Sequence, residues 1–75
     1  MKLANRIRNI REAQRLTQEK VAARCDISPS AYGQIERRAN HATYETLLKI
    51  AGAMGVSLPF LVDVDSEKYV EKNKV

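Results

Sequence analysis

Apolar residues recur at intervals of three and four positions along most of this chain, and that spacing predicts helices. No stretch alternates apolar and polar residues in the manner of a strand. The pattern divides into five segments, which we predict as helices over residues 2–15, 17–24, 29–37, 43–54 and 57–62. The expected fold class is therefore all-α, a compact five-helix bundle forming one domain over residues 1–62.

The second and third segments lie too close together for a flexible linker. Thr17 can cap the second segment through a first-turn amide, and Ser28 followed by Pro29 places a capping hydroxyl and a preset φ before the third. Between them the chain must reverse at Asp26, a residue type that tolerates the left-handed conformation. We expect the arrangement to be a helix-turn-helix.

Two apolar stripes indicate where the core lies. The first segment has a narrow stripe with its arginines mostly outside, so we expect those arginines to be solvated; the stripe consists of Leu3, Ile7, Ile10 and Gln14. The fourth segment, capped by Thr43, has the broadest stripe and is predicted to be the hub of the core; its members are Tyr44, Leu47, Leu48, Ile50, Ala51 and Met54. Residues 39–42 are predicted as a polar loop, and Gly55 suits the left-handed end of the fourth helix.

The helix over residues 29–37 has two faces of different character. Ala31, Ile35 and part of Tyr32 are predicted to turn inward, where Tyr32 is first a packing residue. A helix that enters the major groove of DNA needs short or polar outer side chains, because the base edges there offer distinct donors and acceptors. We predict that the outer arc reads bases, and it consists of Ser30, Gly33, Gln34 and Arg37.

The start of the preceding helix suits a phosphate. Its unpaired backbone amides, together with Thr17 and the amide of Gln18, would meet a DNA phosphate, which positions the protein without specifying sequence.

Charge agrees with a polyanionic partner. The 75 residues carry a net charge of +4, and the ten Lys/Arg against five Asp/Glu within residues 1–49 place the positive charge around the helix pair. Many ordinary domains are also mildly basic, so charge alone does not decide. With no long apolar run and no secretory signal, we expect a soluble cytoplasmic protein with no membrane partner.

Other chemistry finds little support in the sequence. Cys25 cannot form an internal disulfide and is expected to pack in the core, while His41 is expected to be solvated or phosphate-adjacent. No metal cluster, paired carboxylates, activated nucleophile or glycine-rich phosphate loop is evident. We therefore expect no enzyme activity and no metal or other cofactor.

Several motifs at consistent spacing resemble those of the phage repressor and Cro-like helix-turn-helix proteins, the Xre family. The resemblance extends from Leu3 to about Leu61, and its motifs are Leu16-Thr17-Gln18-Glu19, Ile27-Ser28, Gln34-Ile35-Glu36-Arg37, Glu45-Thr46-Leu47-Leu48-Lys49-Ile50-Ala51 and Gly55-Val56-Ser57. Arg15, Asp26 and Arg38 stand where the family frequently has glycine.

The resemblance implies roles for individual residues. Gln18 would clamp a phosphate, Ser30 and Gln34 would face bases, and Arg11 would pair with Glu36 between the first and third helices. The ion pair is physically reasonable, since both residues flank apolar faces near the core. We also assign backbone phosphate contacts to three residues that follow the reading helix: Arg38, Asn40 and Thr43.

The C-terminal segment leaves two readings open. The last predicted helix is more apolar than an exposed end warrants, so its side chains either form a dimer interface or close the bottom of the core; they are Leu58, Phe60, Leu61 and Val62. Residues 63–75 form a polar tail that is either a frayed helix, a disordered end or part of the dimer.

We therefore expect a sequence-specific DNA-binding regulator, a repressor or autoregulator, which binds a near-palindromic stretch of double-stranded DNA as a homodimer. The alternative is an antitoxin-like interaction module that holds a small protein partner through residues 58–75.

Overall fold

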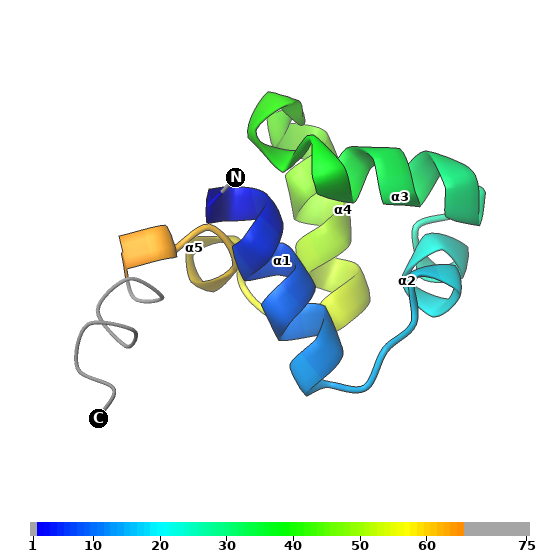
Figure 1. The fold of residues 1–75 in the computed structure, drawn as a ribbon, viewed down its shortest axis with the longest axis horizontal. Helices are drawn as coiled ribbons and strands as arrows, with labels where there is room; N and C mark the ends of the chain where they lie inside the picture. The colour runs from blue at the N-terminus through cyan, green and yellow to red at the C-terminus, as the bar shows by residue number, and fades with distance from the viewer. Residues whose placement is uncertain (1, 66–75) are drawn as a thin grey trace.

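The computed structural model describes residues 2–65 as a helical bundle without strands in that range (Figure 1). Within these residues, five α-helices and one short 3-10 helix follow one another: α1 Lys2–Ala13, α2 Gln18–Arg24, α3 Pro29–Arg37, η1 Ala39–His41, α4 Tyr44–Met54 and α5 Leu58–Leu61. The predicted all-α, five-helix fold is confirmed. In Figure 1, α2 and α5 lie at opposite sides of the molecule, with α1 and α4 between them.

Four helices begin with the same local hydrogen bond. In each, a hydroxyl of the capping residue accepts from the backbone N–H three positions later, at 3.0, 3.1, 3.1 and 3.3 Å for Thr17, Ser28, Thr43 and Ser57 respectively. Each bond satisfies one of the amide groups that a helix start leaves without a partner. The predicted caps and the helix starts they imply are confirmed.

Three turns use the left-handed conformation. Asp26 (φ 61°) reverses the chain between α2 and α3, and Gly55 (φ 70°) ends α4, both as predicted. Arg15 (φ 58°) was not predicted to adopt it. Because this residue turns the chain, α1 stops at Ala13, and the prediction that Gln14 belongs to the apolar stripe is wrong: Gln14 is exposed.

The core lies where α1, α2, α3 and α4 meet. Within residues 2–65, α4 contributes more buried apolar residues than any other helix, which agrees with its predicted central role; the buried set is Ile7, Ile10, Val21, Ala22, Cys25, Tyr32, Ala39, Ile50, Ala51, Ala53, Met54 and Leu61. The predicted stripe of α4 is partly wrong. Tyr44 is 67% exposed and Leu48 is 47% exposed, because the core covers only the opposite side of the helix.

The contact between α1 and α5 corrects two expectations. Arg6 is buried instead of solvated: its guanidinium lies 4.5 Å from the centre of the Phe60 ring, and its Nη2 donates to the Phe60 carbonyl oxygen at 2.7 Å. Leu61 is fully buried, so its proposed place in a dimer interface is wrong; it closes the core. Phe60 and Val62 are the exposed members of this segment, and Leu58 is half-buried.

The remaining expectations concern the connections. Residues 39–42 are not an irregular loop, because Ala39–His41 form a 3-10 turn that buries Ala39. Of the tail predicted over residues 63–75, only residues 63–65 are described, and residues 66–75 lie outside the described range. None of the helices within residues 2–65 is long and apolar enough to cross a membrane.

Candidate nucleic-acid interface

The outer face of α3 is polar and open. Ser30, Gln34 and Arg37 are exposed there, as their spacing on the helix predicts. Gly33 lies between them but is buried, so its predicted exposure is wrong. A Cβ atom at this position would lie 3.4 Å from Nη1 of Arg37 and 3.6 Å from Oε1 of Gln18, which shows that these two side chains cover it.

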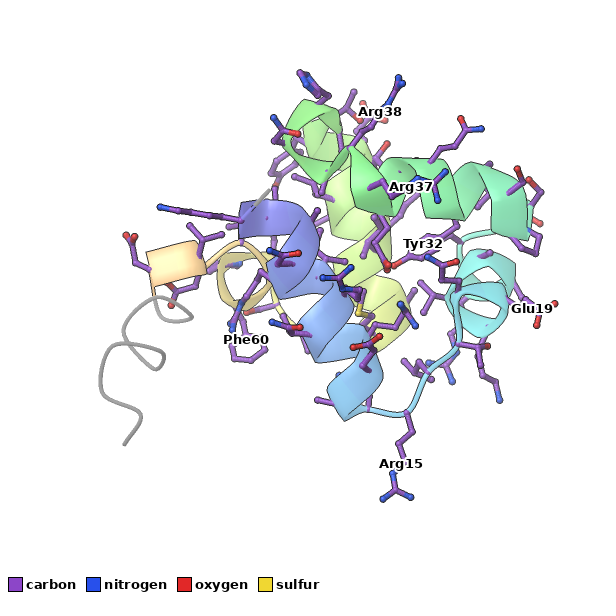
Figure 2. The ribbon with its side chains drawn as sticks, in the orientation of Figure 1. Arg15, Glu19, Tyr32, Arg37, Arg38 and Phe60 are labelled. Atoms are coloured by element: carbon purple, nitrogen blue, oxygen red, sulfur yellow. The ribbon has the colours of Figure 1, made fainter. Side chains whose placement is uncertain are left out.

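The residues predicted to contact phosphates lie at two places. Thr17 and Gln18 stand at the start of α2, where Thr17 is exposed and Gln18 is half-buried. Arg38, Asn40 and Thr43 follow α3 and are exposed. Figure 2 shows Arg38 pointing away from the body of the protein at the end of α3.

A shallow hollow connects the end of α3 with the start of α4. Its volume is about 310 Å³, and its lining residues are Gln34, Ile35, Arg38, His41, Ala42, Thr43 and Thr46. A second hollow beside it is lined by Arg37, Arg38, Asn40 and His41. The predicted base-reading Gln34 and the predicted phosphate contacts Arg38 and Thr43 therefore adjoin one another on the same side of the domain.

A buried charged network connects α3 to α1 and α2. Arg11 of α1 donates to Glu36 of α3 through Nε (2.9 Å to Oε2) and Nη2 (3.2 Å to Oε1), the ion pair that the family resemblance implied. Arg11 also donates through Nη1 to the Leu16 carbonyl oxygen at 2.9 Å. Two more donors reach the same carboxylate: the Tyr32 hydroxyl, 2.6 Å from Oε2, and Nε2 of Gln18, 3.1 Å from Oε1.

The network determines the charge states of its members. Burial by itself would raise the pKa of Glu36, but the hydrogen bonds from Arg11, Tyr32 and Gln18 together outweigh it and lower that pKa. The bond to Glu36 raises the pKa of Arg11, and burial followed by the same carboxylate raises the pKa of the Tyr32 hydroxyl. The network therefore holds one carboxylate and one guanidinium charged and one phenol neutral.

Sequence reasoning missed part of this network. Tyr32 was predicted to be a packing residue, and it is fully buried, but its hydroxyl also bonds Glu36. The signal was present, since residues four positions apart on a helix are neighbours. The contact between Gln18 and Glu36 joins different helices and had no comparable local signal. Cys25 is buried as predicted, with burial raising the pKa of its thiol.

Two helices joined by a tight left-handed turn, the second with an exposed polar face, define the class of this protein as a helix-turn-helix DNA-binding domain. The chain matches the helix-turn-helix family profile over residues 7–61. It therefore belongs to this family, and within it to the phage-repressor (Xre) type.

One curated relative gives a more particular comparison. The chain is similar to the immunity repressor protein of Bacillus phage phi105, with 34% identity over 62 residues. The aligned region covers 83% of this chain and 43% of that protein, so the chain spans less than half of the length of this relative. A comparison with solved structures found no significant match.

Proposed function

We propose that this protein is a transcriptional regulator that reads an operator through the outer face of α3. The observation that carries the proposal is the exposure of Ser30, Gln34 and Arg37 on one face of a helix whose opposite face is anchored in the core. Gln34 would bond adenine through both ends of its amide, Ser30 would accept from or donate to a base edge, and Arg37 would bond guanine or a phosphate. The similarity to an immunity repressor supports repression as the outcome.

Contacts with the phosphates of the DNA backbone would fix the register of α3 on the duplex. The amides at the start of α2 and the Gln18 side chain would hold one phosphate, and Arg38, Asn40 and Thr43 would hold a phosphate beyond the end of α3. These contacts carry no sequence information, so they would act equally on specific and non-specific DNA.

Binding as a homodimer completes the proposal. Phe60 of α5 and Val62 at its end are exposed apolar side chains, and Leu58 of the same helix is half-buried. Helix α5 lies at the side of the molecule opposite α2 (Figure 1). Pairing two copies through this segment would remove apolar surface from water and present two α3 helices to successive major grooves, about 34 Å apart. The operator would then be a near-palindrome.

Selection from a pool of random-sequence duplexes tests this function directly. We expect enrichment of an inverted repeat whose half-sites are separated by about one helical turn. Enrichment of a single half-site would refute the homodimer but support base reading by α3. Failure to enrich any sequence would refute sequence-specific binding.

A protein-binding role is the second candidate, favoured by the same exposed Phe60 and Val62. In this case the segment would hold a small partner protein in the manner of an antitoxin. Purification of the native complex would distinguish the two: a second small protein in constant stoichiometry supports the partner, and a homodimer alone rejects it.

A further inference from the structure

The carboxylate of Glu36 is shared by donors from three helices. Oε2 accepts from Nε of Arg11 and from the Tyr32 hydroxyl, while Oε1 accepts from Nη2 of Arg11 and from Nε2 of Gln18. Glu36 is only 4% exposed, so little water is available to replace a lost donor. Each oxygen therefore has one bond to Arg11 and one further bond that sets the orientation of the group.

Gln18 is the member of the network that reaches the surface. An ionised carboxylate can only accept hydrogen bonds, so the amide of Gln18 must present its NH₂ group, and not its oxygen, to Glu36. That group has a second hydrogen available for another acceptor, and Gln18 is half-buried at the start of α2. Gly33 of α3 lies beside this amide, because a Cβ atom there would be in ordinary van der Waals contact with Oε1 of Gln18, at 3.6 Å.

We propose that Tyr32 is a positioning residue for DNA-backbone binding: its hydroxyl orients the Glu36 carboxylate, which in turn holds the Gln18 amide ready to donate to a phosphate. This inference rests on the proposed function, in which Gln18 contacts the backbone. Tyr32 does not touch DNA, because its side chain is fully buried; Figure 2 shows it in the angle between α2 and α3.

The hydroxyl matters because nothing else on α3 holds Oε2. Without it, Oε2 keeps only its bond from Nε of Arg11, while Oε1 keeps its bonds from Nη2 of Arg11 and Nε2 of Gln18, so the carboxylate can tilt about its two bonds to Arg11. Gln18 then loses a fixed acceptor and samples several rotamers before binding. Ordering one such side chain on association lowers affinity by about threefold to tenfold.

A double-mutant cycle in DNA affinity tests the coupling. The variants are Tyr32→Phe, Gln18→Ala and the pair, titrated against a labelled mixed-sequence duplex of about 20 base pairs in about 50 mM salt, where phosphate contacts dominate. Tyr32→Phe should weaken binding by about threefold to tenfold in the natural chain and by less than about twofold in the Gln18→Ala background. An equal loss in both backgrounds would overturn the proposal, since Tyr32 would then act through the fold as a whole.

Two controls separate positioning from stability. Ile50→Val also removes buried contacts, but in α4 and away from the network, and it should leave affinity unchanged once the folded fraction is taken into account. The cycle is repeated in the Arg15→Gly background, because glycine prefers the left-handed conformation of residue 15 and offsets the lost stability.

The free protein provides a readout that does not depend on DNA. In an NMR spectrum, the side-chain NH₂ of Gln18 should show one proton protected from exchange, and Tyr32→Phe should remove that protection while the backbone spectrum of α4 is retained. A Gln18 amide equally protected in Tyr32→Phe would overturn the inference. Failure of the natural chain to bind the duplex would instead refute the proposed function, which keeps the two outcomes distinguishable.

Discussion

Arg11 and Glu36 are separated by 25 positions in the chain, yet they form a two-pronged ion pair that connects α1 to α3 from within the core. Their side chains are 10% and 5% exposed. Such a pair is held at a high desolvation cost, and the bonds from Arg11 to the Leu16 carbonyl and from Tyr32 and Gln18 to Glu36 offset part of it. The pair therefore helps to fix the position of α3 relative to α1.

Replacing one partner should be strongly destabilising. Glu36→Gln leaves the Arg11 guanidinium without its buried countercharge, so we expect the free energy of unfolding to fall by about 3 kcal/mol or more in urea titrations. Glu12→Gln is the matched control, because Glu12 also lies near Arg11, at 3.9 Å, but its side chain is 61% exposed. Its effect should stay below about 0.5 kcal/mol. Equal effects of the two substitutions would show that burial of the pair is unimportant.

Stability should fall in acid through Glu36. Its folded-state pKa lies below the ordinary value of about 4.3, so the network contributes stability above that value and loses it as pH falls through the folded-state pKa. Thermal unfolding from about pH 7 to about pH 3 should bring the midpoints of the natural chain and Glu36→Gln closer together. A constant difference between the two midpoints across this pH range would contradict the lowered pKa of Glu36.

The turn after α1 should be improved by glycine. Arg15 is exposed and left-handed, a conformation that costs a residue with a Cβ atom about 1–2 kcal/mol. Arg15→Gly should therefore raise the free energy of unfolding by about 1 kcal/mol, measured with urea. Arg15→Ala removes the same charge but keeps the Cβ atom, so it should give no such gain. Asp26→Gly should gain less than Arg15→Gly, because Asp tolerates this conformation better.

Substitutions on the proposed DNA-binding surface should distinguish residues that read bases from residues that contact the DNA backbone. Gln34→Ala should relax the preference at one base position by about 1–3 kcal/mol, because the proposed Gln34 contact distinguishes the bases at that position. Arg38→Ala should instead weaken all duplexes alike and reduce the salt slope by about one per protomer. Competition binding at several salt concentrations measures both. An unchanged base preference in Gln34→Ala would remove that residue from the reading face.

Substitutions in α5 should distinguish a core residue from a residue of the proposed dimer interface. Leu61→Ala opens a cavity at a fully buried site and should lower the free energy of unfolding by about 2–5 kcal/mol. Phe60 is 49% exposed, so Phe60→Ala should cost less stability while weakening the proposed homodimer by about tenfold or more in sedimentation experiments. A Phe60→Ala variant that associates as tightly as the natural chain would exclude this side chain from the interface.

Much of the helix layout could be predicted because its causes are local. Thr17, Ser28 and Thr43 each bond an amide three residues later, so a short window of sequence contains the whole interaction. Asp26 in the tight turn and Gly55 at the end of α4 are likewise explained by backbone preference alone. The left-handed Arg15 escaped prediction because its residue type does not indicate that conformation.

The sequence by itself determined the helices, their caps, the tight turn and the family, since these depend on neighbours within a few positions and on motifs at set spacing. Only the tertiary structure decided burial at the positions where the local pattern was misleading. It covered Gly33 with Gln18 and Arg37, enclosed Arg6 against Phe60, and assigned Leu61 to the core. The physical reason is that burial of a side chain depends on elements far away in the chain, whose approach no local pattern specifies.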